Sequence, residues 1–194
     1  MPLSDPEIRS AFRSSLLPLF AADPGTLVVE ELGLQHGRAR IDLAIINGKL
    51  LGFELKSDLD TLHRLPEQTL VYNSVFDKIT LVATEKHRAD LVLQLPEWWG
   101  ITIARFIQDA VQFEEIRPAQ INSTVEKMAV ARLLWRSEAL DVLQQLGSAN
   151  GVLSKPRAEI YKRLSEVLDT DTLRSKVRQA LCSRSDWRPD ALQM

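Results

Sequence analysis

The chain has 194 residues, of which 45% are hydrophobic, so it can bury one sizeable core with a small appendage. It contains no apolar run of about 18 residues that could span a bilayer and no convincing signal peptide, so we expect a cytoplasmic protein without a membrane partner. The single cysteine, Cys182, excludes an internal disulfide, a CxxC zinc site and a four-cysteine iron–sulfur cluster.

The net charge of −2 hides an uneven distribution of charge along the chain. Residues 1–116 carry 17 acidic and 11 basic side chains, whereas residues 117–194 carry 13 basic and 9 acidic ones. An acidic half beside a basic half suits an enzyme with its own phosphate-binding surface. The alternative is a solvent-exposed helical face that happens to be basic and binds nothing, and it explains the same charge counts equally well.

The first part of the chain alternates helical and strand patterns. Apolar residues at helical spacing predict helices, and short β-branched runs bounded by turn residues predict strands. Pro66 fits the first position of a helix. The expected elements are a helix over residues 5–21, strands over 27–32, 40–46 and 50–56, a helix over 66–76, a strand over 78–84, a short helix over 88–95 and a strand over 100–106.

Beyond Pro118 the pattern changes to helices alone. A long amphipathic stripe predicts one helix over residues 124–146, and a Ser/Gly/Asn-rich linker follows it. Two shorter helices are expected over 156–168 and 171–182. We therefore divide the chain into residues 1–120, which contain all the predicted strands, and residues 121–194, a helical appendage that binds DNA or a partner.

The most informative stretch is a pair of apolar strands joined at Asn47-Gly48. Asp42 interrupts the first strand, where Val or Ile would be favoured, and Glu54-Leu55-Lys56 ends the second. Because alternate residues of a strand share a face, Glu54 and Lys56 point the same way. Two carboxylates beside an ammonium can hold a divalent cation and a water. Such a group of side chains is typical of sites that hydrolyse phosphodiesters.

The turn decides whether Asp42 and Glu54 can share a cation. Asn-Gly most often forms a two-residue type I′ turn, in which paired positions sum to 95 and the two acids lie on opposite faces. In a three-residue loop the sum is 94 or 96, the acids share a face, and Gly48 takes a left-handed conformation. A shared cation therefore requires the less common loop.

Asp42, Glu54 and Lys56 on a hairpin, after one helix and before a helix–strand unit, resemble the PD-(D/E)XK nuclease superfamily. Gln68 and Tyr72 share a face of the next helix and resemble the Gln-x-x-x-Tyr motif of RecB-type nucleases, and the texture from Glu54 to Tyr72 is similar to that of small stand-alone bacterial members. Ile41 replaces the proline of the motif. The resemblance covers about residues 5–106.

The resemblance implies a fold and a set of roles. The fold would be α/β, with a restriction-endonuclease-like mixed central sheet flanked by helices, followed by a small all-helical C-terminal region. The metal ligands would be Asp42, Glu54, the carbonyl of Leu55 and an acid of the first helix, Glu7, with Glu30 or Glu31 as rivals. Lys56 would be the catalytic lysine, and Gln68 and Tyr72 would support it or the substrate.

The expected function is Mg²⁺- or Mn²⁺-dependent hydrolysis of DNA, without a nucleotide cofactor because no nucleotide-binding loop is present. A nuclease-like fold kept as a non-catalytic DNA- or protein-binding module of a defence or mobile-element system is the alternative, and RNA or a nucleotide is a third substrate class. The oligomeric state is open, with a homodimer as one option. Taken separately, Glu54 and Lys56 also fit a surface ion pair, and Gln68 and Tyr72 fit an ordinary amphipathic helix.

The last two predicted helices resemble a helix-turn-helix. Arg174 and Arg178 lie four residues apart on one face of the second helix, with Lys176 nearby, and would contact DNA phosphates. An ordinary helical pair with a solvated basic face is the competing interpretation. Cys182, at the end of this helix, is interpreted as a packing residue.

Overall fold

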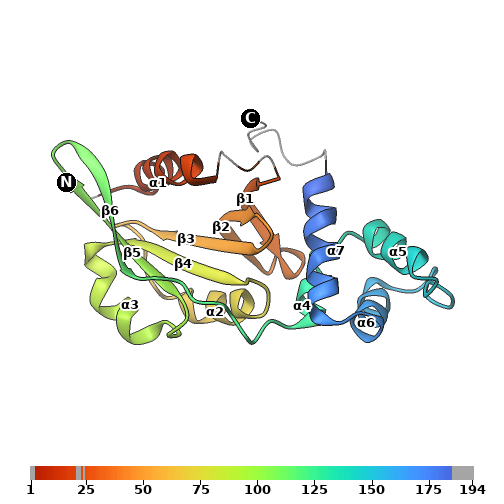
Figure 1. The fold of residues 1–194 in the computed structure, drawn as a ribbon. Helices are drawn as coiled ribbons and strands as arrows, with labels where there is room; N and C mark the ends of the chain where they lie inside the picture. Colours follow the sequence, from red (N-terminus) through yellow and green to blue (C-terminus); the bar gives the residue numbers. More distant parts are fainter. Residues whose placement is uncertain (1–2, 21–22, 24, 185–194) are drawn as a thin grey trace.

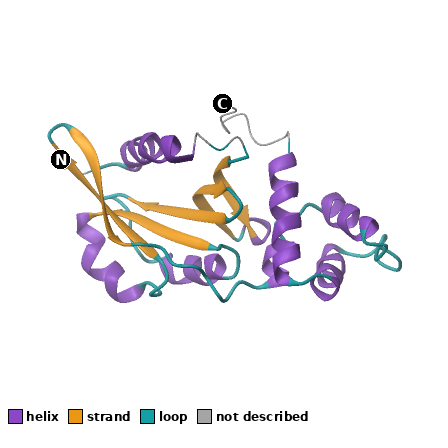
Figure 2. Ribbon diagram, viewed as in Figure 1, coloured by secondary structure: helices purple, strands orange, loops and turns teal. Residues whose placement is uncertain are grey.

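The computed structural model describes residues 3–20, 23 and 25–184. They form one mixed sheet with helices on both faces and a group of helices beside it (Figures 1 and 2). None of the described helices is both long and apolar enough to cross a membrane. The helices are α1 (Asp5–Phe20), α2 (Leu65–Asn73), α3 (Arg88–Gln94), α4 (Lys127–Ala131), α5 (Arg136–Gln145), α6 (Arg157–Val167) and α7 (Thr170–Ser183), with short 3₁₀ turns η1 (Gln35–Gly37) and η2 (Glu85–His87).

The six strands lie in the sheet in the order of the sequence, from β1 to β6. The first three strands are antiparallel, β3, β4 and β5 are parallel, and β6 returns antiparallel to β5. Parallel neighbours need a crossover connection, and α2 and α3 provide the two that occur here. The strands are β1 (Leu27–Leu34), β2 (Ala39–Ile46), β3 (Leu50–Lys56), β4 (Lys78–Thr84), β5 (Gly100–Ile107) and β6 (Ala110–Arg117). The expected mixed α/β fold with C-terminal helices is thus confirmed.

Each face of the sheet buries a separate hydrophobic cluster. On one face, α1 packs through Ile8, Phe12 and Leu16 onto residues such as Phe53 and Leu55. The opposite face packs against α2, α3 and α4, and this larger cluster continues into the C-terminal helices (Figure 1). The apolar face of α1 that the sequence pattern indicates is thus the face buried against the sheet.

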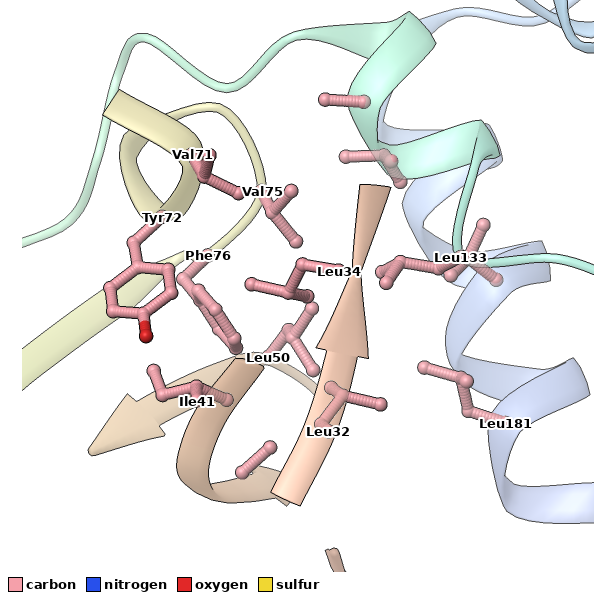
Figure 3. Close-up of a cluster of buried hydrophobic side chains, with 14 of the residues drawn as sticks. Leu32, Leu34, Ile41, Leu50, Val71, Tyr72, Val75, Phe76, Leu133 and Leu181 are labelled. Carbon is pink, nitrogen blue, oxygen red and sulfur yellow. The ribbon is translucent and has the colours of Figure 1, made fainter. Parts of the chain in front are cut away.

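The larger cluster crosses the division that we placed at residue 120. Leu32 and Leu34 of β1 lie between the α2 side of the sheet, with Tyr72 and Phe76, and the C-terminal helices (Figure 3). Leu181 of α7 belongs to the same cluster. The helical region is therefore packed onto the sheet through shared apolar contacts. The division at residue 120 marks a change in sequence pattern, and whether the two parts are separate domains stays a prediction.

Two predictions about the elements were wrong: one expected helix is divided, and one strand was missed. The region 124–146 is two helices, because the chain turns after Ala131 and Trp135 begins α5, with the Glu138 carboxylate accepting a hydrogen bond from the Trp135 N–H at 2.7 Å. Strand β6 was not predicted at all. It follows a tight turn at Gln108 and Asp109, which both have positive φ angles of 51° and 61°.

The hairpin turn is the less common one that a shared site requires. Ile46 pairs with Leu50 and Leu43 with Phe53, so the loop has three residues. Gly48 has φ of 60°, the left-handed conformation that glycine adopts without strain, and the Asn47 N–H donates to the Lys49 carbonyl at 3.0 Å. This register, continued by one residue, places Asp42 opposite Glu54, as predicted.

Candidate functional site

The site lies where β2 and β3 separate. The pairing of the two strands ends at Leu43 and Phe53. At the next position the Leu55 N–H donates instead to Oδ2 of Asp42, at 2.7 Å. The carboxylate of Asp42 thus takes the place of a backbone acceptor, which satisfies a strand N–H that would otherwise lack a partner. An acid inside an apolar strand is explained by this fork.

Glu54 is the centre of the site. Its Oε1 accepts hydrogen bonds from Lys56 Nζ and from Gln68 Nε2, both at 2.7 Å, and the Tyr72 hydroxyl lies 2.8 Å from its Oε2. Glu54 and Lys56 are both buried. A buried carboxylate is expensive unless it is paired and hydrogen-bonded, and three donors from two elements meet that condition here.

Helix α2 delivers Gln68 and Tyr72 because they are four residues apart and share its inner face. Tyr72 is fully buried, with its ring against Phe76 at 6.0 Å and stacked near Trp99 at 6.2 Å. Its hydroxyl also lies 2.7 Å from the Arg40 carbonyl, so it joins α2 to both strands of the hairpin. The aromatic packing fixes where the hydroxyl is presented.

Arg9 of α1 completes the site, and our sequence analysis missed it. Its guanidinium contacts Oδ1 of Asp42 at 2.9 Å and Glu31 at 3.3 Å. Arg9 sits four residues after Asp5, with which it also pairs at 3.5 Å. Arg9 and Asp42 are 33 residues apart in the sequence, so no local pattern connects them.

Burial and mutual repulsion oppose ionisation of the two acids. Burial raises the pKa of Asp42, against the Leu55 N–H and the Arg9 charge, which lower it. Burial also raises the pKa of Glu54, and the negative charge of Asp42 raises it further, against the Lys56 ammonium and the Tyr72 hydroxyl. Both carboxyls therefore have pKa values above their ordinary range, so the site favours additional positive charge.

Several of these side chains, though not Tyr72 or Arg9, line one polar cavity of about 540 Å³. Asp42, Glu54, Lys56 and Gln68 form its inner wall. Oε1 of Gln68 is buried and has no hydrogen-bond partner among the described residues. Chemically, the cavity presents two carboxylates, an ammonium and an unused amide oxygen, which can bind a cation and orient a water. The rim is formed by Asp5, Glu31, Arg38, Arg40, Arg64 and Glu67, among others.

The structure does not bring Glu7 into this cavity. Its carboxylate accepts a hydrogen bond from the Ser4 N–H at 2.8 Å and so caps the start of α1, which corrects the metal-ligand assignment made from sequence. Glu30 pairs with Arg13 at 2.7 Å and lines a different pocket, together with residues of α1. Glu31 is the one of the three candidate acids that lines the cavity.

A family model described as bacteriophage P4 protein cII matches residues 5–192, nearly the whole chain. The chain belongs to the phage P4 cII family. It is 29% identical over 152 residues to protein cII of Enterobacteria phage P4, a match that covers 78% of this chain and 55% of that protein. The chain therefore spans about half the length of the curated relative that it matches.

A solved structure of a protein of unknown function from Silicibacter pomeroyi is also similar. The match is 20% identical, with a TM-score of 0.40, and covers 75% of this chain and 89% of that one. Neither comparison assigns a chemistry to the site of this cII family member.

The basic residues predicted on α7 of this family member do not form a free basic face. Arg174 and Arg178 pair with Asp77, at 3.3 and 3.9 Å, and each is mostly buried. Asp77 precedes β4 and also accepts a hydrogen bond from the Leu50 N–H at 2.7 Å. These two arginines therefore connect α7 to the sheet, while Lys176 contacts Gln145 of α5 at 3.5 Å.

Proposed function

We propose that this protein is a Mg²⁺- or Mn²⁺-dependent nuclease that hydrolyses DNA phosphodiester bonds with a PD-(D/E)XK site. One observation carries the proposal: Asp42, Glu54, Lys56, Gln68 and Tyr72, chosen from the sequence pattern and its resemblance to the PD-(D/E)XK superfamily, meet at one fork of the sheet. A structural ion pair would explain Glu54 with Lys56. It would not explain why Asp42 lies at the same fork, or why the amide of Gln68 and the phenol of Tyr72 both contact the Glu54 carboxylate.

The residues fit a divalent cation. Asp42 and Glu54 both have raised pKa values, which nearby positive charge would offset, and the unpartnered Gln68 Oε1 is a buried acceptor at the same place. No group of three or more His, Cys, Asp and Glu side chains that could hold a metal occurs among the described residues. This proposal uses only two carboxylates, so the ligands are Asp42, Glu54 and the Leu55 carbonyl, with water completing the shell.

Each side chain has a distinct task in this proposal. When bound, the cation stabilises charge on the phosphate and makes a water more acidic. The Lys56 ammonium, fixed by Glu54, positions the attacking water and balances charge that develops on the phosphate oxygens. Gln68 and Tyr72 hold the Glu54 carboxylate in one orientation, and Arg9 fixes Asp42.

The test is cleavage of supercoiled, linear duplex and single-stranded DNA, and of RNA, by the purified protein with Mg²⁺ or Mn²⁺. Lys56→Ala should lower the cleavage rate by about 10²- to 10³-fold, the usual loss when one group that stabilises the transition state is removed. Lys162→Ala, an exposed lysine of α6, is the matched control and should cleave like the wild type. Full cleavage by folded Lys56→Ala would refute the proposal.

Metal binding gives a second readout that does not depend on activity. Asp42→Asn keeps an acceptor for the Leu55 N–H but replaces a charged ligand by an amide, which binds a hard cation poorly. Calorimetric titration should show weaker Mn²⁺ binding by this variant than by the wild type. Equal affinity would mean that the cation, if bound, does not use Asp42.

A non-catalytic module is the second candidate, and one observation favours it. Both oxygens of Asp42 and both of Glu54 already have protein partners, so the acids are satisfied without a metal. In that case the residues at the fork would only stabilise the fold, and DNA or protein would bind at another surface. Wild-type protein that binds neither Mg²⁺ nor Mn²⁺ but retains a macromolecular ligand would select this candidate.

A further inference from the structure

A second cavity lies between the sheet and the C-terminal helices. It has a volume of about 270 Å³ and sits between the end of β1, the η1 turn and the residues that join α4 to α5. Its polar and aromatic lining comes from four separate segments. These residues are His36, Arg132, Trp135, Arg157, Tyr161 and Arg184.

The cavity carries an excess of positive charge. Arg184 is engaged by Glu138 at 2.7 Å and stacks on the Trp135 ring at 4.4 Å. Arg132 and Arg157 are both exposed, and neither forms an ion pair with any of the described residues. Two uncompensated guanidinium groups converging on one concave surface favour an anionic ligand with several acceptor oxygens.

The wall between these arginines is firmly held. The Tyr161 hydroxyl donates to the Leu134 carbonyl at 2.8 Å, and the His36 ring stacks on the Tyr161 ring at 5.9 Å. Burial raises the pKa of Tyr161, while the charges of Arg157 and Arg132 act against that rise, so both guanidinium groups act on the same ring. Arg132 and Arg157 therefore lie beside an aromatic surface, formed by Tyr161 and His36, that is held in place by these contacts.

The η1 turn joins this cavity to the catalytic one. His36 lines the basic cavity, whereas Gly37 and Arg38, the next two residues, line the cavity that holds Asp42 and Glu54. His36 has a left-handed φ of 60°, which is uncommon for a residue other than glycine. One tight turn thus separates the two sites, and a linear polyanion lying over the turn would reach both.

We propose that Arg132 and Arg157 bind the phosphates of a nucleic-acid strand whose neighbouring nucleotides lie at the Asp42–Glu54 site. This inference rests on the proposed function for the choice of ligand. It places the nucleic-acid contact of the helical region on the α4–α5 junction and the start of α6. The arginines of α7 that were predicted for this task are paired with Asp77.

The test is the salt dependence of DNA binding, measured by fluorescence anisotropy with a labelled oligonucleotide and EDTA, so that cleavage does not interfere. Each phosphate contact contributes about −0.9 to the slope of log K against log salt for duplex DNA and about −0.7 for a single strand. Replacing both Arg132 and Arg157 by Gln should flatten the slope by about 1.4 to 1.8. Arg163→Gln, also on α6 and paired with Glu166 at 4.0 Å, is the matched control and should leave the slope unchanged.

The outcomes separate this inference from the proposed nuclease. An unchanged slope in the double variant overturns the inference, whether or not the wild type cleaves DNA. A flattened slope in a protein that does not cleave supports the inference and refutes the nuclease. Inorganic phosphate that binds through the two arginines while the DNA slope stays unchanged would show a small-anion pocket instead, and a wild type that binds no DNA would overturn the inference.

Discussion

The ion pair between Lys56 and Glu54 permits a quantitative prediction. The two side chains are 6% and 3% exposed and their charged atoms are 2.7 Å apart. Lys56→Met removes the ammonium but leaves the carboxylate buried with two neutral donors. Removing one partner of a buried pair costs about 3–5 kcal/mol, and for a chain of this size each kcal/mol shifts the melting temperature by about 2–4 °C. We expect a loss of about 6–20 °C at pH 8.

The stability lost in Lys56→Met should depend on pH, because protonation of Glu54 removes the unpaired buried charge. The pKa of Glu54 is already raised in the folded protein, so its protonated form favours folding and this contribution disappears as the pH rises through the folded pKa. Without Lys56 the pKa rises further. The variant should therefore lose stability with increasing pH above the ordinary carboxyl range, by at most about 1.4 kcal/mol per pH unit.

The assay is thermal and urea unfolding followed by far-UV circular dichroism at pH 5 and pH 8, with EDTA present. The double variant Glu54→Gln with Lys56→Met is the control, because a neutral amide can keep the Gln68 and Tyr72 contacts without a buried charge. It should be more stable than Lys56→Met at pH 8. A single variant that loses less than about 1 kcal/mol, or the same amount at both pH values, would refute this account of the site.

Two further predictions concern the scaffold. Asp77→Ala should destabilise the protein by about 1–3 kcal/mol in urea unfolding, since it leaves the Leu50 N–H without its 2.7 Å acceptor and removes the contacts of Asp77 with Arg174 and Arg178; a wild-type midpoint would show that these contacts do not contribute to stability. Gly52→Ala should cost a similar about 1–3 kcal/mol, because the new Cβ would lie 2.6 Å from Cδ1 of Ile41; an unchanged midpoint would mean that the core yields there freely.

The sequence predicted the hairpin and the side chains that meet at its fork because that information is local. Strand alternation, an acid in an apolar strand and the i, i+4 spacing of Gln68 and Tyr72 are visible without knowing the tertiary structure. The turn type was predicted only conditionally: Asp42 and Glu54 can share a face only if the loop has three residues. The observed register has such a loop.

What the sequence did not reveal depends on contacts between distant segments. Arg9 and Asp42 are 33 residues apart, and nothing local marks Arg9 as the partner of a strand acid. The helix over 124–146 looked continuous because its apolar stripe persists through Leu133, although tertiary packing turns the chain there. Strand β6 was hidden because its turn uses Gln108 and Asp109 in place of the Asn-Gly or Asp-Gly pair that usually signals a hairpin.

The hydrophobic cluster that runs from β1 into α7 limits how this chain can change during evolution. Recombination or truncation near residue 120 would expose Leu32 and Leu34 on one product and Leu133 and Leu181 on the other. Large apolar surfaces left without a partner promote aggregation, so neither product would survive selection as a soluble module. We therefore expect the sheet and the helical region to be inherited together, and the family match extends across both, from residue 5 to residue 192.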